Sequence, residues 1–279
     1  MNFAETYLAQ LERLAERGPL PRVRALHLPP ATIDPLPGDR GEFCALELDD
    51  GSLGLSYVLL DDTLARMREG EGGFALAGAD ALELARAYVS GSGILRTLGF
   101  AAANALTRCF YDRVGYRPDT SVDSIGGLDP QPGERIGMIG LFTPLLGRIL
   151  KSGAQLTVVE LKAELAGDKE GYRVTLDPAE LVGCGKVLST STLLLNDTLD
   201  YMLGFCRDAR WFAMIGPSAG CLPDALFARG VTLVGGTWVH DREGFVDALR
   251  SGRERGEYAR KCAIAADAYP GFEALLPRI

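Results

Sequence analysis

Hydrophobic positions near the N-terminus recur at the spacing of a helix. Phe3, Tyr7, Leu11 and Leu14 lie on one face, with acids and bases between them, which predicts an amphipathic helix. The segment lacks the unbroken apolar stretch of a signal peptide. No stretch of the chain approaches the 18 or more apolar residues that cross a membrane. We therefore expect a cytoplasmic protein without a membrane partner.

After a loop rich in proline and glycine over 29–38, apolar stretches flank the turn Asp49-Asp50-Gly51. This pattern predicts a β-hairpin over 42–60. The segments 79–90 and 93–113 are predicted to be helices, and the second is so rich in alanine that it is expected to be buried on most sides. The first half of the chain is therefore expected to be α+β.

Beyond a connector rich in glycine and proline, short apolar runs alternate with helical patterns. The predicted strands are 135–140, 155–160, 186–189, 211–215 and 231–234, and the predicted helices are 144–151, 178–182, 197–205, 223–229 and 243–251. Strands that alternate with helices predict right-handed crossovers and a parallel sheet. We expect an α/β fold with a smaller α+β domain over 1–130 and a parallel-sheet α/β domain over 131–279.

Composition and charge exclude some functions. The 279 residues are 47% hydrophobic, and 29 Lys+Arg against 37 Asp+Glu leave a net charge of −8. Disorder is excluded, and an acidic chain lacks the basic face that nucleic acids require. The six cysteines are scattered without a CxxC motif, which indicates reduced thiols rather than a disulfide framework or a closed zinc site.

In a parallel sheet, ligands bind where the strands end, so the strand-to-helix loops are the candidate sites. In the first loop Gly140 permits a sharp turn, Phe142 follows, and Thr143 is expected to cap the next helix, whose N–H groups would attract an anion. Glu160 lies at the end of the next strand, where a dinucleotide site would use it to hold a ribose hydroxyl. The GxGxxG motif is missing, so an ordinary capped turn remains an alternative.

Hydroxyl groups fill the second loop, where Thr190, Ser191 and Thr192 lead to Asn196. They would bind phosphates, carboxylates or other ligand oxygens, although capping would account for one or two of them. The third loop contains Gly216, Pro217, Ser218 and Cys221. Its small residues permit close approach of a ligand.

Two side chains are the candidates for direct contact with a metal. Cys221 is expected near a helix N-terminus, where the pKa of a thiol can fall, although a buried inert cysteine is the alternative. His240 follows two glycines that are expected to end the last strand, and it would act as a base or metal ligand. An ordinary loop histidine is the alternative, and the other histidine, His27, is expected to be structural.

Several of these segments together resemble a known family, the heavy-metal chelation proteins. The resemblance rests on the helix motif around Asn104 (Gly-x-Ala-x-x-Asn-Ala) and on Ile139-Gly140-Leu141-Phe142, Thr190 to Thr198, Gly216 to Ala219 with Pro223, and Gly235-Gly236. It implies an enolase-like N-terminal domain, a Rossmann-like C-terminal domain and a site in the cleft between them, with Asn104 in that site. Members often have a polar residue where this chain has Leu141, which argues against a metal ligand in that loop.

The resemblance implies that the protein binds or processes a heavy-metal ion or a metal chelate. Backbone N–H groups and hydroxyls would hold anionic groups, and Cys221 or His240 would touch the metal. The alternative is an enzyme that uses a nucleotide or S-adenosylmethionine, with Glu160 on the ribose. A third possibility is an interaction domain without chemistry. The hairpin edge and apolar helices also predict a homodimer.

Overall fold

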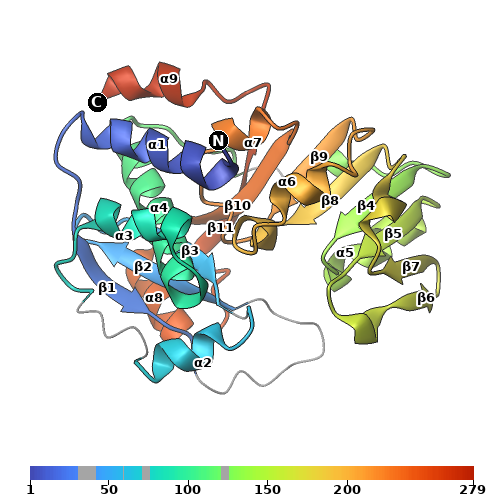
Figure 1. Ribbon diagram of the computed structural model, residues 1–279, viewed down its shortest axis with the longest axis horizontal. Helices are drawn as coiled ribbons and strands as arrows, with labels where there is room; N and C mark the ends of the chain where they lie inside the picture. The colour runs from blue at the N-terminus through green and yellow to red at the C-terminus, as the bar shows by residue number, and fades with distance from the viewer. Residues whose placement is uncertain (31–41, 59, 71–75, 121–125) are drawn as a thin grey trace.

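The computed structural model describes residues 1–30, 42–58, 60–70, 76–120 and 126–279, and it contains two sheets (Figure 1). The small sheet is antiparallel, in the order β1 (Val23–His27), β2 (Phe43–Leu48), β3 (Leu53–Tyr57). The large sheet has the order β11-β10-β9-β8-β4-β5-β7-β6. Its strands are β4 (Arg135–Ile139), β5 (Gln155–Val159), β6 (Gly167–Lys169), β7 (Tyr172–Thr175), β8 (Lys186–Thr190), β9 (Trp211–Ile215), β10 (Leu233–Val239) and β11 (Ala259–Ala265).

The α-helices of the described residues range from four residues to 21. They are α1 (Phe3–Ala15), α2 (Thr63–Arg68), α3 (Ala81–Ser90), α4 (Gly93–Arg113), α5 (Thr143–Lys151), α6 (Leu199–Leu203), α7 (Asp224–Phe227), α8 (Arg242–Arg250) and α9 (Phe272–Leu275). None of the helices in this part of the chain has the length and apolar character that a membrane crossing requires. Of the predicted loop over 29–38, Pro29 and Pro30 are described, and Pro35, Pro37 and Gly38 lie outside the described residues.

The predicted hairpin and the buried alanine-rich helix are confirmed, and they pack directly on each other. A Cβ built on Gly54 of β3 would lie 2.0 Å from the carbonyl oxygen of Ala101 and 2.2 Å from the amide nitrogen of Ala105, both in α4. Only glycine permits this contact. The close approach buries α4 on nearly every side, in agreement with its composition.

The opposite face of the small sheet is covered by the second half of the chain. Leu53 and Leu55 of β3 point away from α4 and pack with Phe245 and Leu249 of α8. Figure 1 shows α8 beside the β1–β2–β3 sheet and α9 next to α1. Arg13 of α1 also pairs with a carboxylate of α9. The boundary at residue 130 stays a prediction, but the α+β part needs α8 to bury its sheet.

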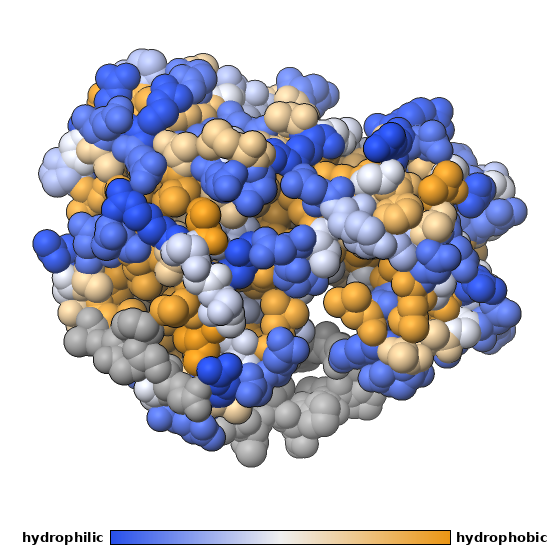
Figure 2. Space-filling view, viewed as in Figure 1, coloured by the Kyte–Doolittle hydropathy of each residue, from blue (hydrophilic) through white to orange (hydrophobic). Residues whose placement is uncertain are grey.

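The α/β class and the five predicted parallel strands are confirmed, and the large sheet has three more strands. β7 is parallel to β5, whereas β6 and β11 are antiparallel to their neighbours at the two edges. β6 is only three exposed residues long and β11 mixes charged and apolar positions, so neither has the apolar pattern of a buried strand. Figure 2 shows apolar side chains on the lobe built around β4 to β7, where Leu161 and Leu176 are exposed.

One predicted strand end is wrong. The last parallel strand was expected to stop at Gly235 and Gly236, but β10 continues through them to Val239. β11 pairs with this extension in antiparallel register, with Gly235 opposite Ala263 and Gly236 opposite Cys262. Because β11 pairs with both glycines, they remain part of the strand. The sequence around the glycines does not indicate this pairing.

Candidate functional site

The order of strands in the large sheet reverses between β4 and β8, because β4 leads outward to β5 and β8 leads the other way to β9. The loops at this point meet as expected for a parallel sheet. Gly140 has φ +81°, and a Cβ built on it would lie 3.1 Å from the side chain of Thr190. A Cβ on Gly216 would lie 2.3 Å from the hydroxyl of Ser191. The structure therefore brings the first three predicted loops into one row.

Glu160 already has partners in this row. Its carboxylate accepts hydrogen bonds from the backbone N–H of Leu141 (3.0 Å) and from that of Leu161 (2.8 Å). An anion at the Gly140 turn would compete with this carboxylate for the N–H group and would meet its charge. The arrangement stabilises the turn and does not favour a bound pyrophosphate.

The helix after this turn begins one residue earlier than expected. Thr143 is the first residue of α5 rather than its cap, and it is exposed. Phe142 occupies the cap position without a side-chain bond, and its N–H points at the sulfur of Met138 (3.4 Å). The expectation that Thr143 caps the helix is therefore wrong.

Local hydrogen bonds occupy most polar groups of the second loop. The Thr190 hydroxyl accepts from the N–H of Thr192 (3.2 Å) and lies 2.9 Å from the hydroxyl of the same residue. Asn196 accepts from the N–H (3.3 Å) and the hydroxyl (2.6 Å) of Thr198. Arg96 of α4 donates to the backbone oxygen of Leu195 (2.8 Å). These contacts anchor the loop on α4 and account for Thr190, Thr192 and Asn196 without a ligand, whereas the hydroxyl of Ser191 is buried beside Gly216.

Asn104 joins three parts of the molecule. Its side-chain N–H groups donate to the backbone oxygens of Leu55 in β3 (2.9 Å) and Ser218 after β9 (3.0 Å). Its oxygen accepts from the hydroxyl of Tyr7 in α1 (3.1 Å). The residue is 2% exposed, so its amide is buried and fully hydrogen-bonded. The hydroxyl of Ser218 is also buried, but it has no hydrogen-bond partner.

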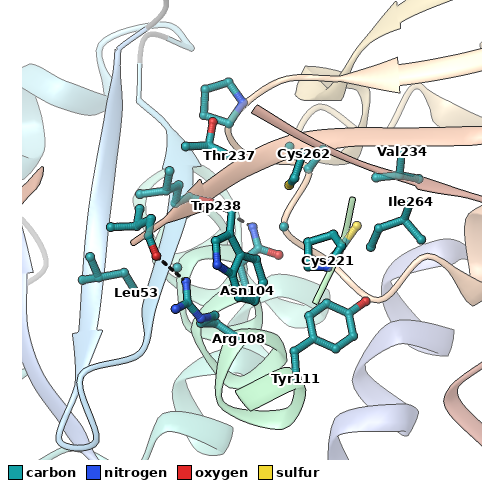
Figure 3. Close-up of a pocket in the computed structure, with 18 residues that line it drawn as sticks. Leu53, Asn104, Arg108, Tyr111, Cys221, Val234, Thr237, Trp238, Cys262 and Ile264 are labelled. Atoms are coloured by element: carbon teal, nitrogen blue, oxygen red, sulfur yellow. Dashed lines mark hydrogen bonds between the residues drawn. The ribbon is translucent and has the colours of Figure 1, made fainter. Parts of the chain in front are cut away.

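Next to Asn104 a cavity of about 50 Å³ lies between the two halves of the chain (Figure 3). Its walls come from β3, α4, the loop after β9, β10 and β11. Pro217, Gly220 and Cys221 belong to the lining, together with the amide of Asn104. The volume holds a few water molecules, whereas sites for drug-sized ligands and cofactors are several times larger.

Cys221 is part of this cavity, but its expected activation is wrong. Burial raises the pKa of its thiol to about 12. The helix that follows, α7, has only four residues and begins at Asp224, so it offers little dipole to oppose the effect of burial. The thiol is therefore protonated at neutral pH unless a ligand displaces the proton.

His240 does not join Cys221. It lies just beyond the end of β10, is exposed, and is not part of the cavity wall. The next residue, Asp241, caps α8 by accepting from the N–H of Gly244 (3.0 Å). His27 is buried in the small sheet, 2.8 Å from a carboxylate oxygen of Glu47. Across the described ranges, no three His, Cys, Asp or Glu side chains converge as a metal-binding group.

The structure adds three residues that the sequence analysis did not select: Arg108, Trp238 and Cys262 all line the cavity. The guanidinium of Arg108 lies 3.9 Å from the centre of the Trp238 ring, donates to the backbone oxygen of Val239 (2.9 Å) and pairs with Asp112 (2.8 Å). Burial raises the pKa of the Cys262 thiol to about 11, against a smaller lowering effect of Arg108. Arg108 follows Asn104 by one helical turn, so the helical spacing could have indicated that both residues lie on the same face of α4. Cys262 lies in a strand that the sequence analysis did not predict.

Comparisons with known proteins agree with this architecture. Two family models match the chain, over residues 124–266 and 41–107, and both are described as "Putative heavy-metal chelation". An uncharacterized protein of Methanocaldococcus jannaschii is 27% identical over 150 residues, 52% of this chain and 55% of the relative, so the match spans about half the length of that relative.

Two crystal structures of family members of unknown function share the fold. The protein from Desulfitobacterium hafniense has 17% identity and a TM-score of 0.65, with 94% of this chain and 98% of the other covered. The protein from Pyrococcus horikoshii has 22% identity and a TM-score of 0.65, with 95% and 100% covered. Since the first family model spans just over half of the 279 residues, the chain belongs to the family described as heavy-metal chelation proteins.

Proposed function

We propose that this protein binds a heavy-metal ion or a small metal chelate in the cavity between its two halves. The observation that carries the proposal is the lining of that cavity, to which Cys221, Cys262 and Arg108 all contribute. Thiolates are the protein ligands that soft metals prefer. The donor set therefore fits a heavy metal and does not fit Ca²⁺ or Mg²⁺, which need oxygen ligands.

The same lining supports a binding site at the interface between the two halves of the chain. β3 and α4 supply one side, and the loop after β9 with β10 and β11 supplies the other. Asn104 holds both sides together through its bonds to Leu55 and Ser218. In this proposal Asn104 acts by holding the walls in place, and the loops at Gly140 and Thr190 support them. The homodimer and the cytoplasmic location stay predictions.

The nucleotide or S-adenosylmethionine alternative has less support. The Glu160 carboxylate is bonded to two backbone N–H groups at the turn where such a ligand would place its own polar groups. The hydroxyls of Thr190, Thr192 and Thr198 have local partners. The cavity volume of about 50 Å³ is also far below that of a nucleotide site.

Filling the cavity tests the proposal. A Cβ on Gly220 would meet nothing closer than Asn104 at 3.8 Å, so Gly220→Met projects a side chain into the space without backbone strain. Gly147→Met is the matched control, because Gly147 lies on exposed α5 with nothing within 4 Å. Equilibrium dialysis with Cu(I), Cd(II), Zn(II) and ferric citrate, followed by elemental analysis, measures the metal retained.

We expect the wild type and Gly147→Met to retain about one equivalent of one of these probes, and Gly220→Met to retain none. Native mass spectrometry of gently purified protein would show the same species, bare or within an organic adduct. Retention of no probe by the wild type, or equal retention by Gly220→Met, would refute the proposal.

A further inference from the structure

We infer that the hydroxyl of Tyr111 holds the bound species in the cavity by donating a hydrogen bond to an oxygen ligand that the metal brings with it. The inference rests on the proposed function, and it adds a binding residue and the chemistry that this residue recognises. The metal then enters the cavity with a hydroxide or a small carboxylate attached, and not as a bare ion.

Tyr111 belongs to the stripe of α4 that faces the cavity. Asn104, Arg108 and Tyr111 follow one another at helical spacing and all line the cavity. The amide of Asn104 is fully hydrogen-bonded, and the guanidinium of Arg108 is bonded to Asp112 and to the backbone oxygen of Val239. Tyr111 is therefore the member of this stripe whose polar group is available to a ligand.

The hydroxyl of Tyr111 is buried and has no hydrogen-bond partner among the described residues. The residue is 4% exposed. Tyr269 lies near this hydroxyl, but the two phenols form no hydrogen bond of normal geometry, and Tyr269 donates its own proton to Asp224 (3.3 Å). Most buried polar side-chain atoms in proteins are paired, so an unpaired one requires an explanation. A polar atom of a bound ligand supplies the missing partner.

The hydroxyl also lies on the side of the cavity that contains Cys221. Figure 3 shows the Tyr111 ring with its oxygen directed toward the side where Cys221 and Ile264 lie. Burial raises the pKa of the Tyr111 hydroxyl well above its ordinary value, and neighbouring groups, Cys221 among them, add to this effect. The phenol therefore keeps its proton and donates it in a hydrogen bond. Such a donor bonds most strongly to an anionic oxygen, which is why hydroxide or a carboxylate fits this position.

The size and the other walls of the cavity limit what accompanies the metal. About 50 Å³ is the space of a few water molecules, so an ion with one or two small oxygen ligands fits. A tetrapyrrole or a siderophore needs several hundred cubic ångströms. Leu55, Val234 and Ile264 supply apolar side chains to the lining, and further polar groups of a larger chelator would find no partners there.

The test compares Tyr111→Phe with the wild type in equilibrium dialysis of the full-length protein. Cu(I), Cd(II) and Zn(II) are offered once in a carboxylate-free buffer and once with added acetate, and ferric citrate is offered by itself. We expect Tyr111→Phe to weaken the retained probe about five- to tenfold, the effect of one lost hydrogen bond. A loss in both buffers assigns the acceptor to hydroxide, whereas a loss that appears only with acetate or citrate assigns it to a carboxylate.

The stability of the metal-free protein gives a second, independent readout. Tyr111→Phe removes a buried hydroxyl that has no partner in the protein, so the melting temperature should rise by about 2 °C. Ser56→Ala is the matched control, because its hydroxyl is also buried and unpaired in the described structure but lies outside the cavity wall. It should raise the melting temperature in the same way and leave metal affinity unchanged.

Tyr88→Phe is the control for the type of substitution. The Tyr88 hydroxyl donates to the backbone oxygen of Leu194, and the residue is not part of the cavity wall. Its loss should lower the melting temperature and leave metal affinity unchanged.

The outcomes separate the two proposals. If Gly220→Met abolishes retention and Tyr111→Phe keeps the wild-type affinity, the proposed function stands and the inference falls. A lower melting temperature of metal-free Tyr111→Phe would show that the hydroxyl has a protein partner, and it would also overturn the inference. So would a visible charge-transfer band with ferric citrate, because the oxygen of Tyr111 would then bond to the metal itself. If the wild type retains no probe, both proposals fall.

Discussion

Asn104 offers the sharpest test of how the two halves are held together. Its carboxamide donates to two backbone oxygens, those of Leu55 and Ser218, and accepts from Tyr7. In Asn104→Ala both oxygens lose a donor at buried positions, since Leu55 is 6% and Ser218 0% exposed. The Tyr7 hydroxyl keeps Thr107 as a hydrogen-bond partner at 2.6 Å, so the substitution costs less free energy at Tyr7 than at the two backbone oxygens.

A buried polar group without its partner costs about 1–3 kcal/mol. Two such groups therefore cost about 2–6 kcal/mol, and we expect Asn104→Ala to lose about 4 kcal/mol of unfolding free energy. That is a large share of the roughly 5–15 kcal/mol that stabilises a typical protein. Urea unfolding followed by circular dichroism measures the change as a lower midpoint at an unchanged slope.

Asn196→Ala is the matched control, because Asn196 is half-buried and its side chain accepts hydrogen bonds from Thr198, two residues away. Loss of such a local cap costs about 1 kcal/mol. If Asn104→Ala loses no more than this control, the tie between β3, α4 and the loop after β9 is not energetically important. A variant of normal stability that fails to bind metal would instead make Asn104 a ligand-binding residue.

Three further predictions follow from burial and hydrogen bonding. Phe245→Ala should lower stability by about 3–5 kcal/mol, because this side chain is 4% exposed between α8 and the small sheet; a loss below about 1 kcal/mol in urea would contradict that packing. All six cysteines are buried, so Ellman's reagent should react slowly with the metal-free native protein and quickly with six thiols in denaturant, whereas a fast native thiol would refute their burial. Glu160→Ala should cost about 1 kcal/mol, because the N–H groups that lose this carboxylate are partly buried or exposed and water can replace it. Metal retention should not change, and a thermal shift of the wild type by NAD or S-adenosylmethionine that this variant abolishes would restore the nucleotide alternative.

Local patterns were enough for most of the elements. The helical spacing of Phe3, Tyr7, Leu11 and Leu14 recurs as the buried face of α1. The turn at Gly51, with φ +87°, joins β2 and β3 as predicted. Five apolar runs became parallel strands. These features depend on residues within one turn or one hairpin of each other, so the chain's own order is sufficient to predict them.

The candidate site was only partly predictable. The loops after β4, β8 and β9 meet because parallel strands end at one edge of a sheet, and this was expected. The role of their side chains was not, since Glu160 and Asn196 bond to backbone groups close in sequence. Such bonds and ligand contacts use the same residue types, and the sequence alone does not distinguish them.

Patterns along the chain were sufficient to predict the α/β class, most helices and strands, and the loops that meet at the sheet edge. They did not predict that β11 returns antiparallel to β10 or that α8 covers the small sheet, which became evident in the folded molecule. These pairings set Cys262 into the same cavity wall as Cys221 and Arg108. Both pairings depend on contacts between residues that are far apart in the sequence. An edge strand and a helix face are placed by the distant surfaces that they bury, and the spacing of residues along the chain does not indicate those surfaces.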